Sequence, residues 1–270
     1  MTTAWGFRTS TGLDFTEAEI VDAHHEACRD TFRALLDSVG IRPGWRVLDA
    51  GCGTGAFLPR LAERAGRVQA IDLATENVAV ARERTADLPT VTVEAGDLLD
   101  LPYPDDSLDA IWCANTVQYL DDAALARALA GFRRVVRPGG LVAVKEIDAS
   151  LIRVEPGDPY LFSDFFRAAA PVSPYARQLL RSRGLHRNLA AAGLTGVRQQ
   201  TVLIEHFAPL TEAEWRFYGP SVAQLARQAV SLGLSQEWTS LLDPATPEHP
   251  LHQPDGYVSQ GAVLAVGTVP

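Results

Sequence analysis

The stretch Val47-Leu48-Asp49-Ala50-Gly51-Cys52-Gly53-Thr54-Gly55 decides the fold of this chain. Val47 and Leu48 are typical of a buried strand, and glycine at every second position removes the Cβ atoms that would keep a ligand away from the main chain. Residues 56–65 follow with helical spacing, so the free N–H groups and the positive end of a helix would face the turn. The stretch therefore predicts a strand, a ligand-binding turn and the start of a helix.

The spacing of these glycines indicates which ligand is bound. The dinucleotide fingerprint places its third glycine three positions after the second, whereas Gly51, Gly53 and Gly55 are evenly spaced and Ala56 occupies that place. Asp49 is unfavourable beside a pyrophosphate, but its carboxylate could orient an ammonium group. A nicotinamide oxidoreductase is therefore disfavoured, and a nucleoside with a cationic amino-acid tail is the expected ligand.

Further strand-like segments follow in the order of an alternating α/β chain. They are a second strand at 68–72 that ends in an acid, a third strand and turn at 91–98, a fourth strand at 108–115, and a glycine turn at 137–140 before a fifth strand at 141–147. Asp72 lies 19 positions after Gly53, near the spacing at which a carboxylate accepts hydrogen bonds from ribose hydroxyls.

Over residues 40–147 these ordered segments resemble the class I S-adenosylmethionine-dependent methyltransferases, in particular their type 11-like, small-molecule branch. The resemblance implies that the glycine loop cradles the methionine moiety, that Asp97 accepts from the adenine amino group and that Leu98 packs on the ring. It implies S-adenosyl-L-methionine as cofactor and S-adenosyl-L-homocysteine as product. The expected cofactor-binding residues are Asp49, Gly51, Cys52, Gly53, Gly55, Asp72, Leu73, Asp97, Leu98 and Asn115.

The whole chain, residues 1–270, is expected to form a single α/β domain with a doubly wound, mostly parallel seven-stranded sheet, the Rossmann-like methyltransferase fold. The last two strands are predicted at 197–207 and 257–266, and the family usually joins them by a short hairpin. The expected parts are an N-terminal helical segment (1–43, with one amphipathic helix over 15–39), a cofactor-binding core (44–150), an aromatic lid and helix (151–196) and an inserted cap (208–257).

Composition excludes some classes of partner. The net charge is −9 and no basic cluster marks a phosphate-binding face, so a small-molecule substrate is expected rather than a nucleic acid. The arginines at 177–187 alternate with leucines at helical spacing and are interpreted as a solvated helix face. There is no run of eighteen apolar residues and no charged n-region, and Cys28, Cys52 and Cys113 lack paired spacing. We therefore expect a cytoplasmic protein without a membrane partner; the oligomeric state is not predicted.

Methyl transfer is an in-line displacement in which positioning dominates and a general base is optional. Ligands of open α/β sheets bind beyond the carboxyl ends of the strands, which limits the candidates. Because adjacent helical residues do not share a face, at most one of His24 and His25 is expected to point inward. Candidate catalytic residues are Glu146, His206 and His25; candidate substrate contacts are Gln118, Tyr119, Trp215 and Tyr218; no metal ligands are predicted.

The leading hypothesis is an O- or N-methyltransferase that acts on a small apolar or aromatic specialised metabolite, because the cap is rich in aromatic residues. Two alternatives stay open. The same scaffold could bind S-adenosylmethionine in an enzyme that does not transfer methyl, such as a cyclase, or the chain could be a noncatalytic binding module. Trp5 and Phe7 are further interpreted as a flap over the cofactor.

Overall fold

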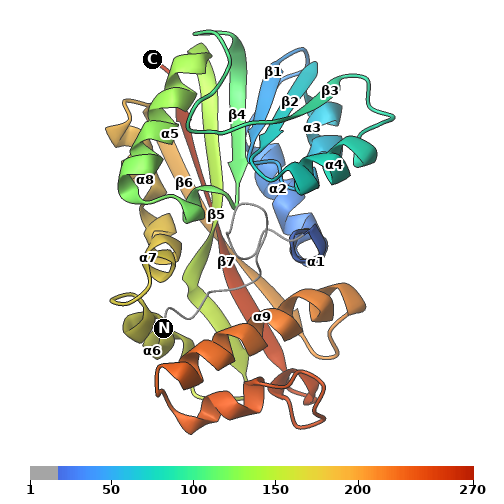
Figure 1. Ribbon diagram of the computed structural model, residues 1–270, viewed down its shortest axis with the longest axis vertical. Helices are drawn as coiled ribbons and strands as arrows, with labels where there is room; N and C mark the ends of the chain where they lie inside the picture. The colour runs from blue at the N-terminus through green and yellow to red at the C-terminus, as the bar shows by residue number, and fades with distance from the viewer. Residues whose placement is uncertain (1–17) are drawn as a thin grey trace.

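The computed structural model describes residues 18–270, so Trp5 and Phe7 lie outside the described residues. Its centre is a seven-stranded sheet with the order β3-β2-β1-β4-β5-β7-β6 (Figure 1). The first five strands pair in parallel, and β7 is antiparallel to both of its neighbours. The strands are β1 (Arg46–Ala50), β2 (Arg67–Asp72), β3 (Val91–Ala95), β4 (Leu108–Ala114), β5 (Val136–Glu155), β6 (Thr195–Phe207) and β7 (Tyr257–Thr268). The predicted mostly parallel, doubly wound sheet is confirmed.

Helices cover both faces of the core sheet. One face packs against α2 (Arg29–Ser38), α3 (Leu58–Arg64) and α4 (Thr75–Arg84) through residues such as Phe32, Leu61 and Val78. The other face packs against α5 (Asp122–Val135) and α8 (Leu185–Ala191) through residues such as Phe132 and Leu189. This two-sided burial explains why β4 is apolar at every position except Asp109.

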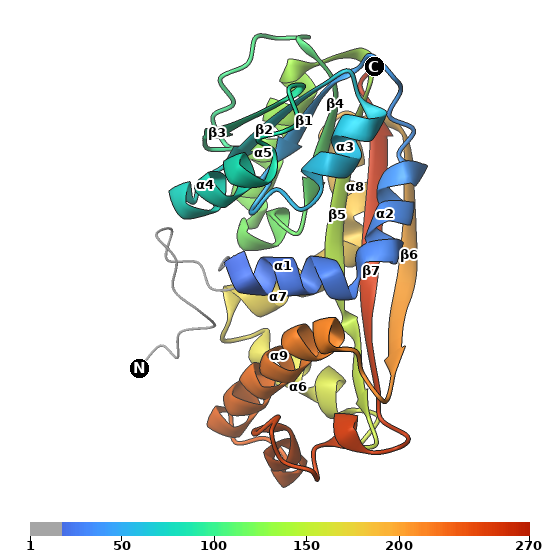
Figure 2. The same cartoon turned by 90° about the vertical axis from the view of Figure 1, so that its right-hand side faces the viewer.

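A second layer stands beyond the carboxyl ends of β1 to β4. It contains α6 (Leu161–Ala169), α7 (Pro174–Arg181), α9 (Glu212–Ser231) and the 3₁₀ helices η3 (Gln236–Leu241) and η4 (Pro250–His252). Its apolar cluster includes Phe165, Tyr218 and Trp238. We call this second layer the cap. The ends of β5, β7 and β6 that lie away from the core support it, so these three strands run through both the core and the cap (Figures 1 and 2).

Several element boundaries differ from the predicted ones. Strand β5 continues past residue 147 because, after a register shift, Arg153 to Glu155 pair again with β7. The predicted helix over 15–39 is two helices, α1 (Ala18–Ala27) and α2, because the backbone at Cys28 leaves the helical region with φ −110° and ψ 13°. The aromatic stretch predicted as a lid forms α6, whose Phe162 and Phe165 pack on Trp238.

Across residues 18–270, no helix has both the length and the apolar character that crossing a lipid bilayer requires.

Candidate functional site

A cavity of about 340 Å³ lies at the carboxyl ends of the parallel strands and continues beneath α1 and α9. One end is formed by the glycine loop and by the turns that follow β2, β3 and β4. The other end is formed by α1, α7 and α9 and by the extended parts of β5 and β7. The first end is polar and the second mostly apolar; the apolar residues there include Ile20, Phe57, Ile152, Phe166, Leu179, Phe217, Val222 and Leu225.

The glycine loop adopts a conformation that requires glycine. Gly51 and Gly53 have φ of +81° and +53°, the left-handed region that L side chains rarely adopt. A Cβ at Gly51 would lie 2.3 Å from Cγ2 of Thr116, and one at Gly53 would lie 3.4 Å from Cγ1 of Val21 on α1. The loop main chain is therefore accessible to a ligand between β1 and α1.

Two carboxylates lie along the rim beside this loop. Asp72 accepts hydrogen bonds from the backbone N–H groups of Gly53 (2.8 Å) and Ala74 (2.9 Å), one at each oxygen. Burial raises the pKa of its carboxyl, and these N–H groups act in the opposite direction. Asp97 is exposed and accepts from the N–H of Leu99 (2.8 Å). Each oxygen of Asp72 keeps lone pairs that can accept from ligand hydroxyls.

Two side chains of β5 hold the segment after β4 in place. Glu146 is 1% exposed, and its Oε1 accepts from the N–H groups of Thr116 (2.9 Å) and Val117 (2.8 Å). Asn115 has φ of +53°, and its Oδ1 accepts from Nζ of Lys145 (2.7 Å). These contacts fix the backbone that carries Asn115 into the cavity.

Helix α1 forms a wall of the cavity and carries both histidines. His24 stacks on Phe217, with ring centroids 4.2 Å apart, and receives a hydrogen bond from Nε2 of Gln260 (2.9 Å). His25 stands edge-on to Phe57 at 4.7 Å. Burial lowers the pKa of His24 well below its ordinary value and that of His25 to about 4, with help from the charge of Lys145. Both imidazoles are therefore uncharged at neutral pH.

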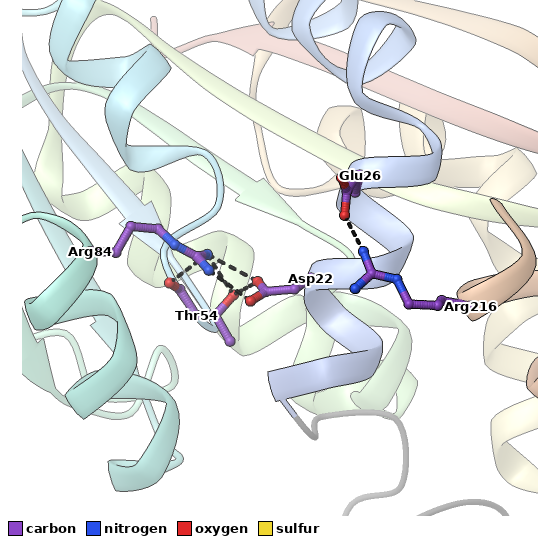
Figure 3. Close-up of polar contacts among 5 residues, drawn as sticks. All are labelled: Asp22, Glu26, Thr54, Arg84 and Arg216. Atoms are coloured by element: carbon purple, nitrogen blue, oxygen red, sulfur yellow. Dashed lines mark hydrogen bonds and ion pairs between the residues drawn. The ribbon is translucent and has the colours of Figure 1, made fainter. Parts of the chain in front are cut away.

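Ion pairs fasten α1 to the core and to the cap (Figure 3). Asp22 accepts from Oγ1 of Thr54 (2.6 Å) and from Nη1 and Nη2 of Arg84 (3.0 and 2.7 Å). One turn further along the helix, Glu26 pairs with Arg216 of α9. Helix α1 thus spans the cavity between the glycine loop and the cap.

With this geometry established, comparison with known proteins identifies the core. Residues 47–140 match a family model described as a methyltransferase domain. The chain carries a class I S-adenosylmethionine-dependent methyltransferase domain. S-Adenosylmethionine is the cofactor of this domain.

Individual relatives match this methyltransferase domain over only part of their length. An uncharacterised protein of a Streptomyces fradiae transposon is 42% identical over 134 residues, 48% of this chain and 38% of that protein. A malonyl-[acyl-carrier protein] O-methyltransferase of Serratia marcescens is 38% identical over 139 residues, 52% of each chain. The chain therefore spans about half or less of these curated relatives. The crystal structure of an Aquifex aeolicus SAM-dependent methyltransferase is similar in fold, with 24% identity, a TM-score of 0.53 and coverage of 70% of this chain and 92% of that chain.

Most residues expected at the site of the methyltransferase domain line the cavity. At the cofactor end these are Gly51, Cys52, Gly53, Asp72, Leu73, Asp97, Leu98 and Asn115; at the acceptor end they are Gln118, Tyr119, Tyr218 and His25. The expectation that only one of His24 and His25 points inward is wrong. Because α1 crosses the cavity, both rings line it: His25 contacts Phe57 and His24 contacts Phe217.

Two residues expected to bind the cofactor lie beneath the loop instead. Asp49 is 1% exposed on β1 and does not line the cavity; burial and the charge of Asp72 raise its pKa to about 8. A Cβ at Gly55 would lie 3.0 Å from Cβ of Ala81. Gly55 therefore permits close packing of the loop on α4, and neither residue reaches the cavity wall.

Three candidates for catalysis or substrate binding also lie outside the cavity lining. Glu146 is occupied with the backbone after β4, as described above. Nδ1 of His206 donates to Oε1 of Glu214 (2.7 Å), and the ring of His206 lies behind the ring of Tyr218. Trp215 packs on the rings of His249 and His252 and does not line the cavity. The expectation that these three side chains face the reacting atoms is corrected.

Sequence reasoning missed Gln260, which lines the cavity, and Lys145, which holds Asn115. Gln260 carries no motif and was not recognisable. Lys145 did carry a signal, because it is the only lysine of the chain and stands within an apolar strand. Among residues 18–270, no group of three His, Cys, Asp or Glu side chains is arranged to hold a metal ion.

Proposed function

We propose that the protein transfers the methyl group of S-adenosylmethionine to the oxygen or nitrogen of a small apolar or aromatic acceptor. The observation that carries this proposal is the continuous cavity, which begins at the glycine loop of the methyltransferase domain and ends among aromatic residues of the cap. A site of this kind combines a polar end with an apolar pocket that orients a small molecule.

The residues at the polar end fit the cofactor. The space at Gly53, which a Cβ would fill, suits the methionine moiety. Asp72 would accept from the ribose hydroxyls, and Asp97 with Leu98 would hold the adenine. When bound, the cofactor supplies a methyl group on a positively charged sulfur.

The residues at the apolar end support positioning rather than base catalysis. Phe217 and Tyr218 of α9 face the cavity together with Gln118 and Tyr119 of the turn after β4. His25, with its pKa near 4, is a weak base at neutral pH. Holding an acceptor in line with the methyl group can contribute about 7–11 kcal/mol without proton transfer.

The finer description of the acceptor is also part of the proposal. We infer that it is a specialised metabolite, because the lining of the acceptor end suits an apolar ring system. Methylation at oxygen agrees with the name of the Serratia relative. Three buried free thiols, Cys28, Cys52 and Cys113, support a reducing, cytoplasmic setting.

The test is incubation of the protein with S-adenosylmethionine that carries a ¹³C-labelled methyl group and with extracts of the source cell, followed by mass spectrometry. A labelled small molecule that disappears with the Asp72→Ala variant would support the proposal and identify the acceptor. Cofactor binding without any labelled product across polar and apolar extract fractions would favour the non-methylating alternative. Binding of a nicotinamide dinucleotide in place of S-adenosylmethionine would overturn the proposal.

A further inference from the structure

The only lysine of the chain is fully buried next to the cavity. Lys145 is 0% exposed, although burial of a charged group costs several kcal/mol unless it is paired. Its Nζ donates to Oδ1 of Asn115 (2.7 Å) and lies 3.6 Å from the ring centroid of Phe32. Asn115 and Phe32 both line the cavity. The ammonium group is therefore separated from the cavity by one side chain.

The surroundings of Lys145 contain no paired anion among the described residues. The groups that face it are His24 and His25 of α1, Cys28 before α2, and Asn115 after β4. The Cys28 thiol stays protonated because burial raises its pKa to about 11. Glu146 is adjacent in β5, and its charge acts on Lys145, but the two side chains form no ion pair and Oε1 of Glu146 accepts from the backbone after β4. Lys145 thus has no ion pair among the described residues, and the neighbouring Glu146 is the carboxyl whose charge acts on it.

The amide of Asn115 connects this cation to the cavity. Because Oδ1 of Asn115 accepts from Lys145, the Nδ2 group is the part of the amide that remains for a ligand. A cation that polarises an amide from the oxygen side strengthens the donor at the other end. Such a donor favours a ligand oxygen that carries negative charge.

We propose that the acceptor is a carboxylic acid, which is methylated at oxygen as its carboxylate anion with Lys145 as counter-charge through Asn115. This inference rests on the proposed function. An anionic oxygen forms the new O–CH₃ bond as the S–CH₃ bond breaks, and the bonding pair remains on sulfur, which becomes neutral. No proton has to leave the acceptor, in agreement with two neutral histidines and no carboxylate at the acceptor end of the cavity lining.

A single lysine makes the test direct, because protein labelled with ¹³Cε-lysine gives one lysine resonance. The protein saturated with S-adenosylhomocysteine would be titrated with acetate, benzoate, 2-naphthoate and decanoate, each compared with its neutral amide. Binding of an anion favours the charged form of Lys145. We expect at least one carboxylate to raise the lysine titration midpoint by about one pH unit, equivalent to about tenfold tighter binding to the charged form, and its amide to leave the midpoint unchanged.

The Lys145→Met variant provides the second measurement. We expect it to lose about tenfold in affinity for the responsive carboxylate but not for the amide, while S-adenosylhomocysteine binding reports that the variant is folded. If no carboxylate moves the lysine resonance, or if the amides move it equally, the inference is overturned even if the variant fails to fold. Absence of S-adenosylhomocysteine binding by the unaltered protein would instead contradict the proposed function.

Discussion

Replacement of Asp22 by Ala should loosen α1 and accelerate release of the cofactor. The carboxylate accepts three hydrogen bonds, two of them from Arg84 and one from Thr54. The Asp22–Arg84 pair is 38% and 30% exposed, so solvent screening limits it to about 0.2–1 kcal/mol. Thr54 is 0% exposed, and its hydroxyl would lose its acceptor at a cost of about 1–3 kcal/mol. The expected loss is therefore about 2 kcal/mol.

Glu26→Ala is the matched control, because Glu26 lies on the same helix but pairs only with two exposed arginines, Arg29 and Arg216. Its expected loss in unfolding free energy is below about 1 kcal/mol. If release of S-adenosylhomocysteine requires α1 to open, a loss of 2 kcal/mol speeds release by about 30-fold. Chemical denaturation and stopped-flow displacement of S-adenosylhomocysteine measure the two effects. Equal losses of stability in both variants would refute the burial reasoning, and an unchanged release rate in Asp22→Ala would refute the gating role of α1.

The stability conferred by Asp22 also depends on pH. Burial alone would raise the pKa of this carboxyl, but the hydrogen bonds and charge of Arg84 and the hydroxyl of Thr54 outweigh it and hold the pKa below its ordinary value. A carboxyl with a depressed folded-state pKa contributes stability that is present above the unfolded value, near 4, and is lost as pH falls through the folded value. The difference between the wild type and Asp22→Ala should therefore diminish in acid below that range.

Three further predictions concern the cofactor, the buried lysine and the cap. Asp72→Ala should weaken S-adenosylhomocysteine binding by about 1–3 kcal/mol, measured by calorimetry; an unchanged affinity would exclude its ribose role. Because burial lowers the pKa of Lys145 to about 7 from 10.5, wild-type stability should rise relative to Lys145→Met by about 1.4 kcal/mol per pH unit between about pH 7 and 10; parallel denaturation curves with no such slope would show that the folded-state pKa is ordinary. Phe217→Ala should raise the KM for the acceptor at least tenfold, whereas Trp215→Ala should lower the melting temperature without changing KM, because only Phe217 lines the cavity; steady-state kinetics with the identified acceptor would reveal the opposite order if α9 were rotated.

The core could be predicted because its signals are local in sequence. Gly51 and Gly53 have positive φ, a backbone conformation that favours glycine. Both glycines can be recognised from the sequence alone, without knowledge of tertiary contacts. The carboxylate of Asp72 follows a predicted strand, and it reaches the loop by accepting from the N–H of Gly53. Parallel strands that meet at one edge bring these groups together whatever the rest of the chain does.

The acceptor end could not be predicted because it depends on which face each side chain takes. Adjacent strand residues point to opposite sides of a sheet, so Lys145 rather than Glu146 reaches Phe32 and Asn115. The rotation of α9 similarly decides that Phe217 lines the cavity and Trp215 does not. A pattern of apolar residues indicates a buried face but not the neighbour against which it packs.

The uninterrupted course of β5, β7 and β6 through core and cap has a consequence for exchanging modules between proteins. Phe207 at the end of β6 pairs directly with Tyr257 at the start of β7, and their rings lie 5.2 Å apart. The intervening residues 208–256 therefore leave the sheet and return to it at one pair of opposite positions on β6 and β7. A chimaera with junctions at these two residues would replace helix α9 and the loops after it while keeping the strand register, so that acceptor preference could be transplanted onto an unaltered cofactor end.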